Sequence, residues 1–349
     1  MGRPDGRRLM IALVGLALAG AVIFGQARSA SNDLGVSLTG LVTTYDHPSN
    51  EVEVILARGD GQIFGALAQD PALRRPEVFR YGPFDEAYRA QRPLLTYLAW
   101  GLSGGQPSGV PAALVVVALA GAALAVYAMT ALSARASLAP LLVISPAGLA
   151  TLHSLTPELL SVALALFGLH AWQRGRVPLA IAMFTLAALG RETLLLFPLV
   201  LIIDQVVRRR RPHASLATPF VVFALWFVAV RTRLDQPYWP LSTQGDLSGL
   251  PFVELARALP DFTAMDALTL VLAIAAVLVA ADTLRHDRRS LMAWTAVGYG
   301  ALATLFGHDI WVEWLNAGRL LVPLYALGLA LAPMSLGARR TGPAPAPAP

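Results

Sequence analysis

The sequence predicts an all-α fold: a polytopic bundle of about ten membrane-spanning helices with one long outer loop that carries short amphipathic helices. Three observations lead to this prediction. The 349 residues are 56% hydrophobic and only 14% charged, with a mean hydropathy of +0.58, whereas soluble domains carry about 25% charged residues. Apolar runs of roughly span length recur along the chain. Arginines gather at alternate junctions between these runs, as expected for cytoplasmic loops.

The first apolar run, 9–24, follows Arg3, Arg7 and Arg8. We interpret it as a retained helix with a cytoplasmic N-terminus. A cleaved signal peptide is the alternative, because small residues follow at 27, 29 and 30. The remaining runs are 111–133, 137–152, 157–173, 177–190, 191–207, 216–230, 265–283, 291–306 and 318–336.

Arginine clusters set the predicted orientation, and all 27 cationic side chains are arginines. The clusters lie at 135, 174–176, 208–211, 285–289 and 339–340. They share one side of the membrane if 177–207 forms two short helices. Both termini are then cytoplasmic, and the protein lies in the cytoplasmic (inner) membrane. Arg231 and Arg233 are exceptions, because they fall on the outer side.

The same composition bounds the functions that remain. The pI near 9.9 is explained by cytoplasmic arginines, so no nucleic-acid partner is expected. The absence of cysteine excludes disulfides and thiolate chemistry. Residues 1–336 are predicted to form a single domain, followed by a disordered Ala/Pro tail at 337–349.

The first outer loop, 26–110, is long enough to be functional. Within it, 61–70 has the apolar spacing of a short amphipathic helix, with Asp60 at the N-cap position. Asp60 therefore has two interpretations, as a helix cap or as a functional acid. Aromatic residues beside Arg89 and Arg92 fit either interfacial anchoring or a lipid-phosphate site.

Several short sequence motifs together resemble those of a known protein superfamily. The chain resembles poorly characterised bacterial multi-pass proteins of the GT-C glycosyltransferase superfamily. The likeness covers most of residues 40–335. It rests on DGQIF at 60–64, AQDP at 68–71, YRAQRPLL at 88–95, LGRET at 189–193 and GRLLVPL at 318–324.

The resemblance implies a membrane enzyme that takes a sugar from a polyprenyl-phosphate donor. The acceptor would be an envelope glycan, a lipid or a protein. In such enzymes the catalytic acid lies in the first outer loop, the position that Asp60 occupies here, and Gln62 follows in the same phrase. The rival acids of this loop are Asp46, Glu51 and Glu53, and Glu192 is a second catalytic candidate.

Transfer in one inverting step needs a base for the acceptor proton and cations for the leaving phosphate. Arginine suits the second task because its planar fork donates two hydrogen bonds. The candidates are Arg89, Arg92, Arg191 and Arg319. For Arg191 and Glu192 the alternative is a capped turn in water, and for Arg319 it is snorkelling at the end of a span.

His308 and Asp309 form a further polar pair, which we assign to substrate binding. They are also possible ligands of a divalent metal, but adjacent residues have no diagnostic ligand spacing. No cofactor or metal is therefore expected. Besides membrane lipids, the predicted partners are the donor and the acceptor only.

Two other classes remain open. A transporter or flippase of a lipid-linked sugar would be expected to show repeats and mid-membrane polar residues. The spans at 265–281 and 291–306 are almost free of ionisable groups, which favours chemistry at one surface. A non-catalytic protein that retains the fold is the third possibility.

Overall fold

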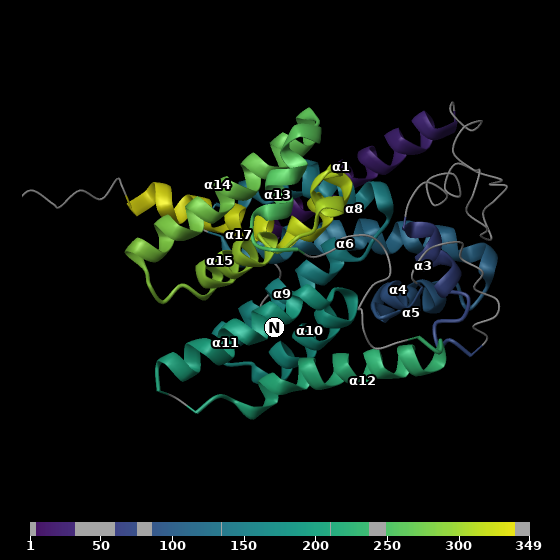
Figure 1. The fold of residues 1–349 in the computed structure, drawn as a ribbon, viewed down its shortest axis with the longest axis horizontal. Helices are drawn as coiled ribbons and strands as arrows, with labels where there is room; N and C mark the ends of the chain where they lie inside the picture. The colour runs from purple at the N-terminus through teal and green to yellow at the C-terminus, as the bar shows by residue number, and fades with distance from the viewer. Residues whose placement is uncertain are drawn as a thin grey trace, which may run out of the picture.

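The computed structural model describes residues 5–31, 60–74, 86–133, 135–209, 211–236 and 249–338, and its regular elements there are all helical (Figure 1). The all-α prediction is confirmed for this part of the chain. The longer helices are α1 (Gly6–Ser31), α5 (Pro93–Leu102), α6 (Val110–Leu132), α9 (Glu158–Gln173), α10 (Val177–Gly190), α11 (Leu196–Val207), α12 (Thr218–Arg233), α14 (Ala264–His286), α15 (Leu291–Ala303) and α17 (Trp314–Ala338). The shorter ones are α3 (Gly61–Leu67), α4 (Glu86–Ala90), α7 (Leu141–Ile144), α8 (Pro146–Ser154), α13 (Val253–Ala258) and α16 (His308–Trp311).

Five of the described helices are long and apolar enough to cross a membrane. They contain the segments Gly6–Gln26, Pro107–Leu132, Ala214–Arg233, Ala264–His286 and Trp314–Ala332. By contrast α9, α10, α11 and α15 have between 12 and 16 residues, or about 18–24 Å at 1.5 Å per residue. A hydrocarbon core of about 30 Å needs more. The count of about ten spans therefore stays a prediction.

The predicted span 137–152 is not one straight helix. It consists of a short 3-10 turn, α7 and α8, with a bend of 53° between the segments Ala136–Ile144 and Pro146–Ser154. Pro146 disfavours helical backbone at the residue before it and has no N–H to continue the ladder. Ser145 instead caps α8 by accepting a hydrogen bond from the Gly148 N–H. Counted as one broken span, this pair raises the number of candidates to six.

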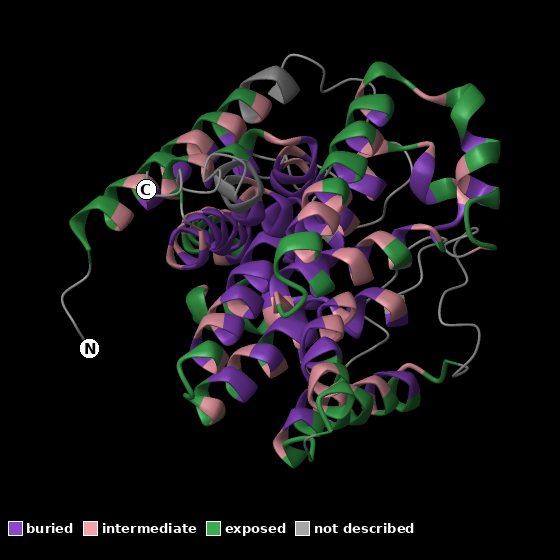
Figure 2. Ribbon diagram, turned by 90° about the vertical axis from the view of Figure 1, so that its left-hand side faces the viewer, coloured by how far each residue is buried: buried purple, intermediate pink, exposed green. Residues whose placement is uncertain are grey.

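The core lies between α6, α9 and α17, and the outer helices turn apolar surface outwards. Figure 2 shows buried residues at the centre of the molecule and exposed residues on its periphery. The periphery is not polar, as it would be in a soluble protein: large apolar side chains are exposed along α12 and α14, among them Val221, Leu225, Val271, Ile274 and Leu278. A lipid-facing surface explains this arrangement.

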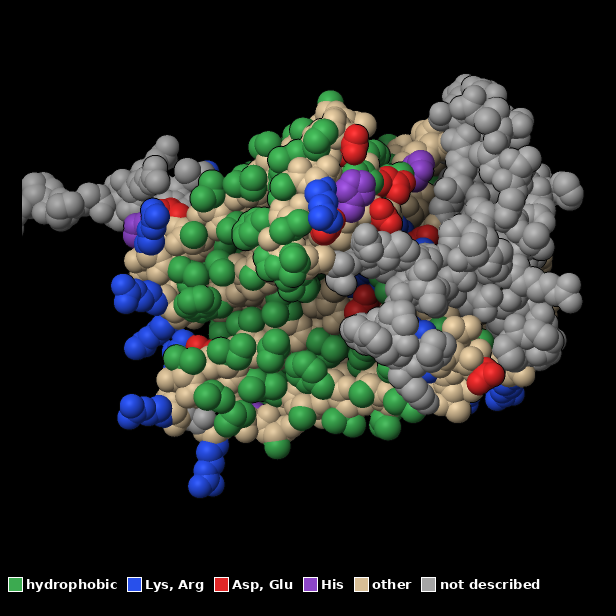
Figure 3. Space-filling view, viewed as in Figure 1, with side chains coloured by type: hydrophobic (Ala, Val, Ile, Leu, Met, Phe, Trp, Pro, Cys, Tyr) green, Lys and Arg blue, Asp and Glu red, His purple; other side chains and the backbone are tan. Residues whose placement is uncertain are grey.

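Arginine-rich turns lie at one end of the bundle. Figure 3 shows arginine side chains gathered at the left end, where Figure 1 places the ends of α11 and α14, and a band of apolar side chains beside them. Arg8, Arg174 and Arg176 all act electrostatically on the His170 ring. The rings of Trp172 and His213 lie 6.3 Å apart. The start of α1, the α9–α10 turn and the segment before α12 therefore share this end.

The predicted break within 177–207 is confirmed. The helix α10 ends at Gly190, a 3-10 turn η4 (Glu192–Leu195) follows, and α11 begins at Leu196. The chain reverses there: near the end of α11 Gln205 accepts a hydrogen bond from the His213 N–H, whereas Gly190 lies against Ser161 near the start of α9. The turn η4 is thus at the end of the bundle opposite to the arginine-rich turns.

The described part of the first loop docks on the end of α12. A small apolar cluster joins α3, α4 and α12, and the Trp226 indole N–H donates to the Ala90 carbonyl over 3.0 Å. Arg233 donates to the Ala72 carbonyl, and the buried Arg231 lies over the Phe227 ring. These two arginines, the exceptions to the charge pattern, therefore bind protein.

The predicted C-terminal tail stays a prediction. The last helix continues to Ala338, two residues beyond the predicted end at 336. Residues 339–349, which make up most of the predicted tail, lie outside the described residues.

Candidate functional site

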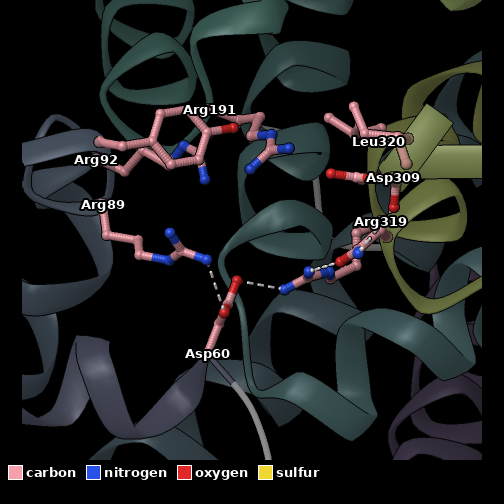
Figure 4. A pocket seen from close by; sticks show the side chains of 10 residues that line it. Asp60, Arg89, Arg92, Arg191, Asp309, Arg319 and Leu320 are labelled. Atoms are coloured by element: carbon pink, nitrogen blue, oxygen red, sulfur yellow. Dashed lines mark hydrogen bonds and ion pairs between the residues drawn. The ribbon is translucent and has the colours of Figure 1, made fainter. Parts of the chain in front are cut away.

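Segments far apart in the sequence meet at the end of the bundle opposite to the arginine-rich turns. They enclose a cavity of about 190 Å³ (Figure 4). Its charged walls come from the start of α3, the α4–α5 junction, the α10–η4 junction, α16 and the first turns of α17. Tyr88, Ile310, Asn316 and Leu320 complete the lining, and the charged side chains are Asp60, Arg89, Arg92, Arg191, Asp309 and Arg319.

Two arginines hold the Asp60 carboxylate. Arg89 donates from Nη2 to Oδ1 over 3.1 Å, and Arg319 donates from Nη1 to Oδ2 over 2.6 Å. Arg319 is itself fixed by the Leu315 carbonyl at 3.1 Å and by the Asn316 side chain at 2.5 Å. Both oxygens of Asp60 are therefore engaged by cations from different parts of the chain.

Asp60 is at the N-cap position of α3, but its side chain makes no capping hydrogen bond. The interpretation of Asp60 as a helix cap is wrong, and the helix ends at Leu67, before the predicted boundary at 70. Burial alone would raise the pKa of the Asp60 carboxyl, but Arg319 and Arg89 outweigh it and hold the pKa well below its usual range. The clamped carboxylate is ionised and only weakly basic.

Glu192 binds Arg92 through two hydrogen bonds. The Arg92 Nε and Nη2 atoms donate to the two Glu192 oxygens over 2.8 and 2.7 Å, and the Tyr88 ring lies 4.3 Å from the Arg92 guanidinium. Burial would raise the pKa of Glu192, but Arg92 and then Arg191 lower it to about 2. Glu192 is not among the cavity-lining residues. The structure therefore places it as the partner of a lining arginine.

Arg191 has its own carboxylate, which the sequence did not identify. Its Nη1 atom lies 3.1 Å from Oε1 of Glu158, and the two side chains are only 8% and 3% exposed. In the described part of the chain, Nε of Arg191 and Oε2 of Glu158 have no hydrogen-bond partner. The available signal was a glutamate in the first turn of the mostly apolar α9, because a buried acid requires a cation.

Glycines allow two of these arginines to reach the cavity. A Cβ atom on Gly190 would lie 2.0 Å from the Ser161 hydroxyl, and one on Gly318 would lie 3.0 Å from the Pro146 carbonyl. The approach at Gly190 is closer than a Cβ atom allows without a shift of its neighbour, and the approach at Gly318 is tight, so glycine favours close helix packing at both positions. Each glycine immediately precedes a lining arginine, Arg191 or Arg319.

The remaining predicted site residues divide into three groups. Asp309 lines the cavity. The adjacent His308 does not; it lies 3.5 Å from Asp309 and 4.0 Å from Asp261, on a more exposed surface. The side chain of Gln62 lies outside the description, as do the rival acids at 46, 51 and 53.

The charges of the lining favour an anion. Four arginines face two acids in the lining itself, and Glu192 and Glu158 behind the wall balance the other two cations. Among the described residues, no three His, Asp or Glu side chains are grouped closely enough to hold a metal ion. Guanidinium groups arranged around one space are the protein's usual means of holding phosphate or carboxylate.

Comparisons with known proteins add no assignment. The chain matches no known protein-family model, and no curated protein or solved structure is detectably similar to it. The chemistry of the cavity is therefore the basis for a functional proposal.

Proposed function

We propose that this protein is a membrane glycosyltransferase that moves a sugar from a polyprenyl-phosphate donor to an acceptor at the outer face of the cytoplasmic membrane. One observation carries the proposal. Four arginines and the Asp60 carboxylate surround one cavity, at the end of an apolar bundle opposite to its arginine-rich turns. Because arginine excess marks cytoplasmic loops, the cavity end faces outwards.

A polyprenyl-phosphate donor fits the cavity because its lining has a charged part and an apolar part. A phosphate binds the guanidinium groups, and a hydrocarbon chain leaves past Ile310 and Leu320, the apolar residues of the lining. Leu320 belongs to α17, which is long and apolar enough to lie in the bilayer. An amphiphilic anion is thus a better match than a small soluble one.

The proposed reaction is a direct displacement at the anomeric carbon. The acceptor hydroxyl oxygen forms a bond to this carbon while the bond from the carbon to the phosphate oxygen breaks. The electron pair goes to the leaving polyprenyl phosphate, whose added negative charge the arginines stabilise. Asp60 takes the acceptor proton as general base.

A transporter of a lipid-linked sugar would bind a similar anion, so the test has to separate transfer from translocation. Purified protein in liposomes is supplied with a polyprenyl-phosphate sugar and an acceptor, and both product and donor movement are measured. Sugar transfer supports the proposal; translocation without transfer refutes it and assigns a transporter. No event of either kind refutes it and leaves a binding or scaffold role.

Arg319 and Arg191 provide the test of phosphate binding. We expect Arg319→Ala to weaken donor binding and Arg319→Lys to restore part of it, because an ammonium cannot make the two-pronged contact. Arg191→Ala should weaken donor binding less, because Arg191 already pairs with Glu158. Arg208→Ala is the control, since Arg208 pairs with Asp204 at the end of α11, away from the cavity. Equal donor affinity in Arg319→Ala and wild type would remove Arg319 from the site.

A further inference from the structure

The four lining arginines do not all have the same kind of partner. Arg92 and Arg191 pair with Glu192 and Glu158, neither of which lines the cavity. Arg89 and Arg319 instead share Asp60, which does line it. The carboxylate between these two guanidinium groups thus occupies a position suited to an anion that enters the cavity.

We propose that Arg89 and Arg319 form the phosphate subsite and that Asp60 is an internal substitute for the ligand, displaced when phosphate binds. This inference rests on the proposed function. It specifies which arginines bind the phosphate, and it places donor binding before proton removal from the acceptor. A carboxylate offers two oxygens to the paired arginines, and a phosphate offers the same contacts with more charge. Exchange therefore keeps both cations neutralised.

The surroundings of Asp60 permit this exchange. Its side chain makes no bond to the α3 backbone, whereas its carbonyl accepts hydrogen bonds from the Ile63 and Phe64 N–H groups. The helix is anchored separately by the buried side chains of Ile63, Phe64 and Leu67. Asp60 can therefore rotate away while α3 remains in place.

The size of the cavity points in the same direction. At about 190 Å³, it is smaller than the roughly 300 Å³ at which small-molecule sites begin. Rotation of the Asp60 side chain would enlarge the cavity between Arg89 and Arg319, where we propose that the phosphate binds.

Displacement also supplies a base at the required moment. While both guanidinium groups bind it, Asp60 is held ionised and takes up protons poorly. Once phosphate takes these cations, the carboxylate recovers its basicity. Donor binding would thus precede and activate proton removal from the acceptor.

The test compares phosphate binding in wild type, Asp60→Asn, Asp60→Glu and Asp309→Asn, each in nanodiscs of zwitterionic lipid. Inorganic phosphate and a short-chain polyprenyl phosphate are titrated separately. We expect Asp60→Asn to bind about tenfold more tightly, because the internal competitor is gone. Asp60→Glu, which keeps the competitor, should bind as wild type does.

Asp309→Asn is the matched control, since it removes the same charge from the lining and leaves the Asp60 carboxylate between Arg89 and Arg319 in place. A much smaller gain is expected for it. An equal gain in Asp60→Asn and Asp309→Asn would reduce the effect to long-range charge and overturn the proposal, as would weaker binding by Asp60→Asn. If Asp60→Asn binds both inorganic phosphate and the polyprenyl phosphate more tightly than wild type, the subsite recognises phosphate itself. If it binds only the polyprenyl phosphate more tightly, the subsite recognises the lipid headgroup.

If Asp60→Asn does not fold, the exchange is measured in wild-type protein by infrared spectroscopy. Phosphate should shift the stretching band of one isotope-labelled aspartate carboxylate, and an unchanged band would contradict displacement. Neither measurement depends on turnover. Tighter phosphate binding by Asp60→Asn, together with no sugar transfer by the wild-type protein, would support the displacement of Asp60 and reject the glycosyltransferase. Sugar transfer by the wild-type protein without tighter phosphate binding by Asp60→Asn would support the glycosyltransferase and reject the displacement.

Discussion

The Arg319 guanidinium lies 2.6 Å from the Asp60 carboxylate, although the two residues are 259 positions apart in the chain. This contact links the start of α3 in the first loop to the first turns of the last helix. Asp60 and Arg319 are respectively 19% and 13% exposed at the side chain, so water screens their attraction only weakly. Loop and bundle are thus joined at the cavity itself.

The destabilising effects of replacing Arg92 and of replacing Glu192 should not be additive, because the two side chains form one ion pair. Arg92→Ala leaves Glu192 partly buried without its cation, at a cost of about 3 kcal/mol. Arg92→Ala combined with Glu192→Ala should cost less than the sum of the two single changes. Unfolding of all three variants in detergent measures this coupling. Additive losses would show that the pair contributes little.

The stability of the protein should fall in acid because of Glu192. The pKa of this group is lowered from its ordinary value of 4.5 to about 2. Its contribution is therefore complete above pH 4.5 and is lost as the pH falls to about 2, on the order of 3 kcal/mol in total. Glu192→Gln should show a flatter stability profile over this range. Parallel profiles for variant and wild type would contradict the assignment.

Gly190→Ala should destabilise the η4 turn. The added Cβ would lie 2.0 Å from the Ser161 hydroxyl, and overpacking of this kind costs about 1–3 kcal/mol. Ser161→Ala in the same chain removes the hydroxyl and should restore part of the loss. Melting temperatures of the single and double variants test this. No recovery in the double variant would place the strain elsewhere, for example at Leu94, 3.1 Å from the same Cβ.

Topology gives a prediction that is independent of chemistry. Reporter fusions at Arg135, Arg174, Arg209 and Arg288 should lie inside the cell, and fusions at 60, 155, 245 and 310 outside. The physical reason is the retention of arginine-rich loops on the cytoplasmic side. Opposite locations for Arg209 and Arg288 would refute the predicted orientation.

The sequence predicted the helical class, most of the longer helices and several residues that line the cavity. Apolar runs marked the positions of the longer helices, because burial in lipid or in the core demands a continuous apolar segment. The break within 177–207 was predicted from the arginine clusters, which share one side of the membrane only if this segment forms two helices. Short motifs with charged residues beside apolar stretches indicated Asp60, Arg89, Arg191 and Arg319 as candidate site residues.

The tertiary structure decided the partners. Whether Asp60 caps a helix or binds arginines depends on the direction of one side chain, and local spacing permits both. The pairing of Arg191 with Glu158 and of Arg92 with Glu192 depends on which helix ends meet. Such contacts join residues that the chain keeps distant, so no periodicity records them.

The number of membrane spans also depends on tertiary structure as well as on sequence. Hydropathy measures how apolar a segment is, but it does not distinguish a helix that faces lipid from one enclosed by other helices. The helix α9 is apolar and only 16 residues long, and most of its side chains are buried among its neighbours. Composition and the lengths of the apolar runs predicted a helical membrane protein. Packing decided which helices form the core and which arginines meet Asp60, because burial and charge pairing depend on distances in space.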